Sequence, residues 1–159
     1  MRIPTLLAAA MTASACVSVD VAETDSPALR ETIVPLQWRS TYEEYHFAPA
    51  VRAGDYVFLS GVVAAPVGGG TNEEAFEAGY DRAFAVIAAV LAEADAEWSD
   101  VVDITTYHTD LPAQFEVFAR VKDRYVPEPY PAWTAIDVDR LLLDEGVVEI
   151  RVIAYAPRD

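Results

Sequence analysis

A single carboxylate, Glu149, lies within the apolar segment VVEIRVIAYAP at 147–157. A carboxylate between valine and isoleucine is costly to bury, so it needs a partner or a chemical role such as proton transfer. Two interpretations follow: Glu149 is a proton shuttle, or it forms an ion pair with Arg151 or with a basic residue of another subunit. Trp133, in PAWTAIDVD at 131–139, is either an aromatic wall of a ligand cleft or a packing residue of an interface.

Other residues with chemical potential are few. Arg151 follows Glu149 by two positions on the same strand face, roughly 7 Å along the strand. It could supply a cation to a ligand, or pair with Glu149 or a neighbouring strand. His46 and His108 belong to no metal-binding pattern, so we expect polar strand-end positions or backbone hydrogen bonds and no metal. Ser60 has no histidine at a spacing that indicates a catalytic triad, so it is not predicted to be a nucleophile.

Periodicity predicts the elements that position these residues. Two helices are expected: one opens at Thr71, with Glu74 at capping-box spacing, and ends near Ala94, and the other is capped by Asp110 and ends before Pro127. The expected strands cover 50–53, 56–65, 101–109, 133–139 and 147–155. This order predicts an α+β domain with a mixed sheet that two helices cover on one face.

The alternation of residues in the last expected strand indicates what covers each face of the sheet. Val148, Ile150, Val152 and Ala154 share the face expected under the helices. Glu149, Arg151, Ile153 and Tyr155 share the other face, which is half apolar and half charged. Two helices cannot cover both faces, so the second face is expected to meet another subunit.

Composition and charge exclude several classes of protein. The chain has 159 residues, 53% of them hydrophobic, which suits one domain with a real core. Its formal charge of −15 disfavours a nucleic-acid partner, because nucleic-acid binding relies on Lys and Arg. The loop Gly68-Gly69-Gly70 lacks the Lys-Ser/Thr of a phosphate-binding loop, so no nucleotide cofactor is expected.

Residues 1–16 have the pattern of an export signal, with Arg2 before a short apolar core and small residues before Cys16. Ala13-Ser14-Ala15-Cys16 resembles a bacterial lipoprotein box, which would anchor the protein to a membrane through a lipid on Cys16. The alternative is plain secretion with cleavage near Ala15. Residues 17–35 are predicted to be a flexible acidic tether and 36–159 the folded domain, located outside the cytoplasm, in the periplasm.

Four segments resemble one known family in sequence, order and spacing. They are FAPAVRAGDYVFLSG at 47–61, DVVDITTYHTDL at 100–111, PAWTAIDV at 131–138 and VVEIRVIA at 147–154. The family is the Rid (YjgF/RidA) family. The resemblance implies a chorismate-mutase-like, RidA-like α+β fold, assembled as a homotrimer with small-molecule sites in clefts between subunits. Founding members are enamine/imine deaminases that hydrolyse intermediates such as 2-aminoacrylate to a keto acid and ammonia without metal or cofactor. Some members carry an endoribonuclease label, but the excess of acidic over basic residues in this chain argues against that activity.

The resemblance also assigns roles by position. Glu149 matches the strand glutamate that manages protons and water, and Ser60 and Gly61 match residues that line the cleft. Phe47 stands where deaminases usually have tyrosine, and Trp133 replaces the arginine that grips the substrate carboxylate.

The replacement at Trp133 changes the expected chemistry. Tryptophan has one N–H donor and no charge, whereas arginine has five donors and a permanent cation. Losing that contact costs roughly 1.5–3 kcal/mol of carboxylate binding. Two function hypotheses therefore stand: an exported Rid-like hydrolase of a neutral, aromatic or cationic compound, or a non-catalytic trimer that binds a small molecule or an envelope protein.

Overall fold

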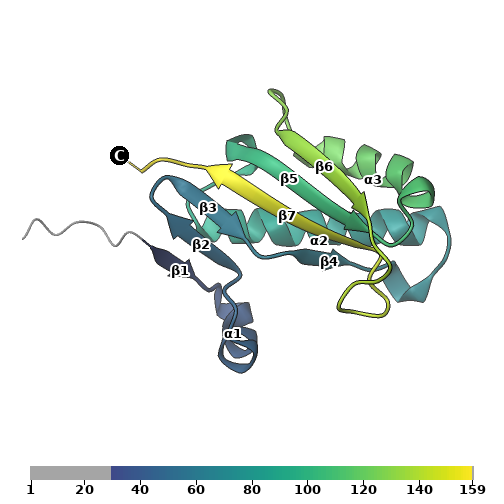
Figure 1. Ribbon diagram of the computed structural model, residues 1–159, viewed down its shortest axis with the longest axis horizontal. Coiled ribbons are helices and arrows are strands. Elements are labelled where there is room, and N and C mark those ends of the chain that lie inside the picture. Colours follow the sequence, from purple (N-terminus) through teal and green to yellow (C-terminus); the bar gives the residue numbers. More distant parts are fainter. Residues whose placement is uncertain (1–29, 159) are drawn as a thin grey trace, which may run out of the picture.

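The computed structural model describes residues 30–158, so the expected export signal, Cys16 and most of the expected tether lie outside the described residues. Three short 3-10 turns accompany ten regular elements. The elements are β1 (Glu31–Ile33), α1 (Arg39–Tyr45), β2 (Ala50–Ala53), β3 (Tyr56–Leu59), β4 (Val62–Ala64), α2 (Glu73–Glu93), β5 (Val101–His108), α3 (Leu111–Tyr125), β6 (Ala132–Asp137) and β7 (Val148–Tyr155) (Figure 1).

The seven strands form one mixed sheet. Its order is β1-β2-β3-β7-β5-β6, and β4 pairs with β7 beyond the end of β3. β5 and β6 run parallel, while the other neighbours are antiparallel. Strand β7, yellow in Figure 1, therefore lies in the middle of the sheet. The predicted α+β fold with a mixed sheet is confirmed.

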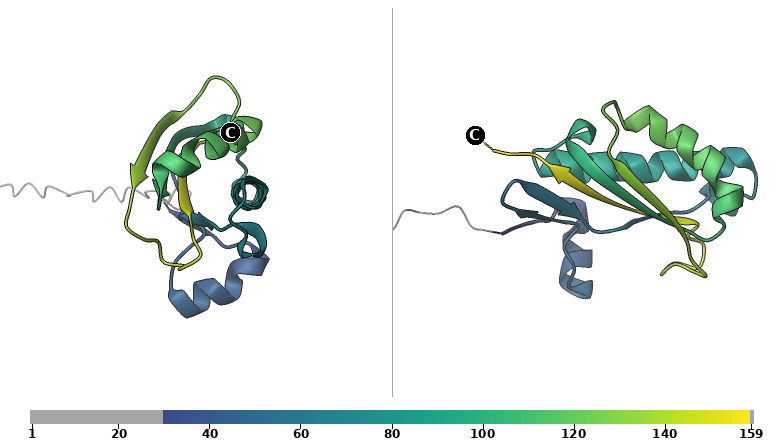
Figure 2. Two further views of the ribbon diagram at one scale, coloured as in Figure 1. Left: turned by 90° about the vertical axis from the view of Figure 1, so that its right-hand side faces the viewer. Right: turned by 45° about the horizontal axis from the view of Figure 1, so that its top comes forward.

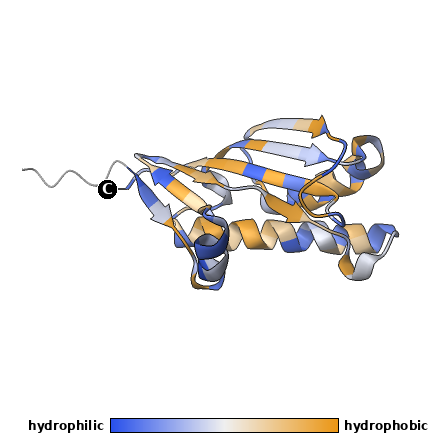
Figure 3. Ribbon diagram, turned by 60° about the horizontal axis from the view of Figure 1, so that its bottom comes forward, coloured by the Kyte–Doolittle hydropathy of each residue, from blue (hydrophilic) through white to orange (hydrophobic). Residues whose placement is uncertain are grey.

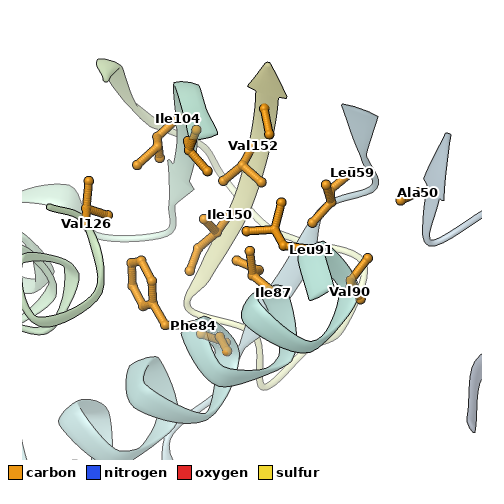
Figure 4. Packing of buried hydrophobic residues seen from close by; sticks show 14 of the residues in the cluster. Ala50, Leu59, Phe84, Ile87, Val90, Leu91, Ile104, Val126, Ile150 and Val152 are labelled. Atoms are coloured by element: carbon orange, nitrogen blue, oxygen red, sulfur yellow. The ribbon is translucent and has the colours of Figure 1, made fainter. Parts of the chain in front are cut away.

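Helices α2 and α3 lie together on one side of the sheet (Figure 2). Beneath them, β7 presents Val148, Ile150, Val152 and Ala154, all completely buried. Phe84, Ile87 and Leu91 of α2 lie over this surface and form the core with it (Figure 4). The other face of β7 is partly open, and Figure 3 shows hydrophobic and hydrophilic residues alternating along the strands. The predicted division of β7 into a core face and an open face is confirmed.

The two helices begin at side-chain caps and are joined by ion pairs. Asp110 caps α3 as predicted, with Oδ1 accepting from the backbone N–H of Ala113. The cap of α2 is Asn72, one residue after the expected Thr71, because asparagine is at least as good a cap as threonine. Along the helix surfaces, glutamates of α2 pair with arginines of α3. These pairs are Glu73–Arg120 and Glu77–Arg124.

Three features differ from the sequence prediction. Strand β1 lies within the segment expected to be a tether, and its Ile33 is buried against the core. The short helix α1 was not predicted, since its exposed, mainly polar sequence has no apolar stripe. The single strand expected over 56–65 is divided into β3 and β4 by Ser60 and Gly61, and this division shapes the candidate site.

Candidate functional site

The break between β3 and β4 is a bulge opposite β7. Phe58 pairs with Ile153 and Val62 pairs with Ile150. The segment from β3 to β4 therefore contains one residue more than the stretch of β7 that it pairs with. Ser60 holds this irregular segment, because its hydroxyl donates to the carbonyl of Ala48 at 2.6 Å. Bulges of this kind occur often beside active sites, where they redirect a side chain or end a pairing.

The side chain of Glu149 packs directly against Gly61. Any side chain at position 61 would overlap the Glu149 carboxylate, so only glycine permits this approach. In the sheet, Glu149 pairs with Val63 of β4 and Tyr107 of β5. It is half-buried and forms no side-chain hydrogen bond or ion pair with any residue that the structure describes. An unpaired, partly exposed carboxylate in a sheet can exchange protons with a bound molecule.

Arg151 lies on the same strand face as this carboxylate, and Phe47 is next in sequence to the residue that binds Ser60. Arg151 is half-buried on the same face of β7, and no ion pair joins it to Glu149 or to another carboxylate within residues 30–158. The pairing of Arg151 with Glu149, one of the interpretations from sequence, is therefore not formed within one chain. Phe47 is 37% exposed and adjoins Ala48, whose carbonyl binds Ser60. The structure thus gathers Ser60, Gly61, Glu149 and Arg151 around one bulge, whereas no contact joins Phe47 to them among the residues described.

Trp133 lies on the other side of the sheet. It pairs with Ile104, a completely buried residue of the face beneath the helices. Its indole ring stacks on Phe115 of α3, with centroids 5.4 Å apart and planes at 7°. Glu149 projects from the opposite face, so a cleft containing both residues requires two copies of the chain.

A chain of hydrogen bonds fixes the Trp133 side chain. Its Nε1–H donates to the hydroxyl of Thr106 at 3.1 Å, and this hydroxyl lies 3.0 Å from Nε2 of His108. Nδ1 of His108 lies 3.2 Å from Oε1 of Gln114, whose Nε2 donates to Thr109 at 3.1 Å. Because Oε1 can only accept, Nδ1 of His108 is the donor to Gln114, while the single hydrogen of the Thr106 hydroxyl is shared between Nε2 of His108 at 3.0 Å and the Thr134 carbonyl at 3.4 Å.

The burial of His108 favours the neutral form of its ring. Burial lowers its pKa, although the Gln114 hydrogen bond and the nearby Asp137 carboxylate act in the opposite direction. The sequence predicted a strand-end position or a backbone hydrogen bond for His108. The strand-end position is confirmed, since His108 is the last residue of β5, but both ring nitrogens bind side chains from β5 and α3 rather than the backbone.

A lysine that the sequence analysis did not select provides a cation beside Trp133. The Nζ of Lys122 lies 5.0 Å from the centre of the Trp133 ring and 5.8 Å from that of Tyr130. It also donates to Asp123 at 2.6 Å. Lys122 follows Phe115 by seven residues, or two helical turns, so the two side chains share one helix face. This spacing could have indicated from sequence that Lys122 lies beside the partner of Phe115. Ammonium groups over aromatic rings are attracted by the ring electrons.

Neither a metal cluster nor a membrane span is found within residues 30–158. No group of three or more His, Cys, Asp or Glu side chains there is arranged to hold a metal ion. None of the helices described is long and apolar enough to cross a bilayer.

Comparisons with known proteins agree with this architecture. Residues 40–156 match the family model described as Endoribonuclease L-PSP. The RutC family protein YjgH of Escherichia coli is 37% identical over 129 residues, covering 80% of this chain and 96% of YjgH. The solved structure of protein YJGH has a TM-score of 0.69 at 36% identity, covering 82% of this chain and 99% of that one. RidA from an Antarctic Psychrobacter has a TM-score of 0.59 at 34% identity, covering 69% and 87%.

Proposed function

Because this chain belongs to the Rid (YjgF) family, we propose that it hydrolyses a small enamine, imine or related carbonyl compound in clefts of a homotrimer. The observation that carries the proposal is the unpaired Glu149 carboxylate packed against Gly61. A structural carboxylate in a sheet would be expected to have a cation or a hydrogen-bond donor, and Glu149 has neither among residues 30–158.

The proposed reaction needs one group that can both accept and donate a proton. Water adds to the C=N carbon of the imine while the Glu149 carboxylate takes one water proton. The same proton then moves to the nitrogen, which gives a carbinolamine. Glu149 next accepts the hydroxyl proton of the carbinolamine and delivers it to the same nitrogen as the C–N bond breaks, so a carbonyl compound and ammonia leave. An enamine first becomes the imine by protonation at carbon. General acid–base catalysis of this kind contributes about 10²–10⁴ in rate.

A homotrimer is supported by the open face of the sheet. Tyr56, Phe58 and Tyr155 remain 37–45% exposed there and contact one another, with Tyr56 and Tyr155 centred 5.2 Å apart. An aromatic patch beside charged residues resembles the composition of a subunit interface. A neighbouring copy would also bring its Trp133 side toward Glu149, which one chain alone cannot do.

Substrate preference follows from Trp133. Its single N–H already donates to Thr106, so it has no donor left for a substrate carboxylate. We therefore propose a neutral or aromatic substrate rather than 2-aminoacrylate; a cationic substrate is disfavoured because the Lys122 ammonium already lies 5.0 Å from the centre of the Trp133 ring. RNA is not proposed as a substrate, because a formal charge of −15 repels phosphate backbones.

The test is imine hydrolysis by the wild-type chain and by Glu149→Gln, with Glu145→Gln as the control. Glu145 is an exposed neighbour on the loop before β7. We expect Glu149→Gln to lose about 10²–10⁴ of kcat and Glu145→Gln to keep full activity. Full activity of Glu149→Gln would refute the role of Glu149, and a preference for carboxylate-bearing imines would refute the substrate class.

The alternative function is a non-catalytic trimer that binds a small ligand or an envelope protein. It is favoured by the occupied N–H of Trp133, which removes the substrate grip of the deaminases. In that case no imine, with or without a carboxylate, is hydrolysed above the uncatalysed rate, and Glu149→Gln alters only binding or stability.

We also propose export and a lipid anchor on Cys16, supported by the sequence of residues 1–16. Cell fractionation with fatty-acid labelling tests this, with Cys16→Ala as the variant. Wild-type protein should label and sediment with membranes, and Cys16→Ala should do neither. Labelling that persists in Cys16→Ala would contradict the anchor.

A further inference from the structure

A groove of about 420 Å³ lies between the start of α1 and the outer surface of α2. It is lined by Gln37, Trp38 and Thr41 on one side and by Val86 and Ala89 of α2 on the other. Its volume falls in the range of about 300–1,000 Å³ that is typical of small-molecule sites. None of the residues proposed for hydrolysis lines this groove, so it is separate from that site.

The local fold directs three of these side chains toward α2. The 3-10 turn η1 (Leu36–Trp38) runs directly into α1. Trp38 and Thr41 are three residues apart, and Gln37 and Thr41 are four apart, so the three side chains share one face of this continuous helical segment. Helix α1 projects from the body of the domain (Figures 1 and 2), and both Gln37 and Ala89 are exposed, so the groove opens to solvent.

Trp38 is the unusual side chain of the groove. It is half-buried yet lies outside the core cluster, and no other aromatic ring within the described part of the chain packs on it. The other two tryptophans, Trp98 and Trp133, both pack against the core and contact other rings. Because Trp38 lines the groove opposite two short aliphatic side chains, part of its ring surface is open to a flat ligand.

The polar groups of the groove are free and can be reached from solvent. Gln37 is exposed and Thr41 is half-buried, and neither side chain forms a hydrogen bond with another residue of the range 30–158. The Gln37 amide has two donor hydrogens and an acceptor oxygen, and the Thr41 hydroxyl both donates and accepts. No charged side chain of the described residues lines the groove, so the matching ligand is uncharged and carries groups that both donate and accept, as alcohols do.

We propose that this groove binds the ring of an uncharged saccharide. The C–H groups on one face of a pyranose form a flat apolar surface that packs on Trp38, and its hydroxyls exchange hydrogen bonds with Gln37 and Thr41. An open groove suits such a ligand, because the hydroxyls that do not contact the protein remain in water. A phosphorylated or carboxylated sugar does not fit, because the chain carries a formal charge of −15 and the described lining offers no cation.

The test measures binding of methyl β-D-glucopyranoside to the full chain, with sorbitol as the matched open-chain compound that has hydroxyls but no ring face. Indole N–H signals are followed by NMR at millimolar concentrations, and the Trp38 signal is the one that is missing in Trp38→Phe. We expect the glucoside to shift the Trp38 signal and to leave those of Trp98 and Trp133 unchanged, and we expect sorbitol to shift none. A free sugar and one unit of a glycan chain share this chemistry, so cellotetraose is the second probe. Tighter binding of cellotetraose than of the glucoside supports a glycan chain, and equal binding supports a free sugar.

Variants of the groove test its location. Gln37 is exposed, so Gln37→Leu should fold normally and weaken binding about fivefold, which corresponds to one net hydrogen bond. Trp38→Ala should remove the ring surface and weaken binding about tenfold while the circular dichroism spectrum stays unchanged, because Trp38 lies outside the core. Tyr45→Ala, at an exposed position at the end of α1, is the control and should bind like the wild type. The proposal is overturned if the glucoside leaves the Trp38 signal unmoved, if sorbitol shifts it equally, or if Gln37→Leu or Trp38→Ala binds as tightly as Tyr45→Ala.

Discussion

Replacing Thr106 by valine should show how strongly the structure depends on the hydrogen-bond chain beneath Trp133. Thr106 is completely buried, and its hydroxyl is the partner of both Trp133 Nε1–H and His108 Nε2. Valine has nearly the same shape but no hydroxyl, so Thr106→Val leaves one donor and one acceptor without partners. Each unsatisfied buried group costs about 1–3 kcal/mol, and Trp133 is partly exposed, so we expect a total loss of about 2–4 kcal/mol. That is a large share of a typical domain stability of about 5–15 kcal/mol.

The matched variant is Thr106→Ser, which keeps the hydroxyl and removes one methyl group. Loss of the methyl costs about 1 kcal/mol, so serine should be the milder change although it packs less well. Urea unfolding followed by circular dichroism at one fixed protein concentration measures both variants, because the stability of an oligomer depends on concentration. If Thr106→Val is as stable as Thr106→Ser, packing rather than hydrogen bonding governs this position and the reasoning is wrong.

A double-mutant cycle isolates the contribution of Trp133. In a Trp133→Phe background the indole N–H is absent, so Thr106→Val should be less destabilising there than in the wild type. Equal losses in the two backgrounds would show that the hydrogen bond between Trp133 and Thr106 contributes nothing to stability.

Three further predictions follow from buried groups. Gly61→Ala should displace the half-buried Glu149 carboxylate at a cost of about 1 kcal/mol, because the overlapping atoms belong to a flexible side chain that can rotate away. Adding Glu149→Ala should remove this cost in thermal unfolding, and a loss that persists without Glu149 would refute the contact. The pKa of His108 is lower in the folded chain, so the unfolded chain binds a proton at a higher pH. The free energy of unfolding should therefore fall as the pH drops below about 6.5 and level off below the folded-state pKa. If the urea midpoint depends on pH equally in the wild type and in His108→Gln, this prediction is wrong. Arg52 is buried and donates to the carbonyls of Ala94 and Ala156, both at 2.5 Å, so Arg52→Met should cost about 2–4 kcal/mol by urea unfolding, and a neutral result would show that these bonds are dispensable.

Part of the candidate site could be predicted from sequence because it depends on local pattern. Glu149 is conspicuous as an acid in an apolar strand, and the two-residue alternation of β7 assigned it to the open face. The hydrogen bond from Ser60 to the Ala48 carbonyl could not be predicted in this way. It depends on a one-residue shift between two strands that are paired through β7, and sequence does not state the register of distant strands.

Lys122 and His108 escaped prediction for a related reason. Each looks ordinary within its own element, since a lysine on a helix and a histidine at the end of a strand are usually solvated. Both are buried here because α3 packs over β5 and β6 and brings Gln114 and Trp133 against them.

Local sequence pattern predicted the family, the α+β class with its two long helices, and the alternation that leaves Glu149 on the open face of the sheet. Those properties arise from periodicity and from residues that are neighbours along the chain. The position of Trp133 beneath the helices, with its N–H bound to Thr106, follows instead from the packing of α3 over the sheet. The sequence AWTAID at 132–137 has no clear alternation of apolar and polar residues, so which side chains face the helices is set by parallel pairing with β5, a contact between residues far apart in sequence.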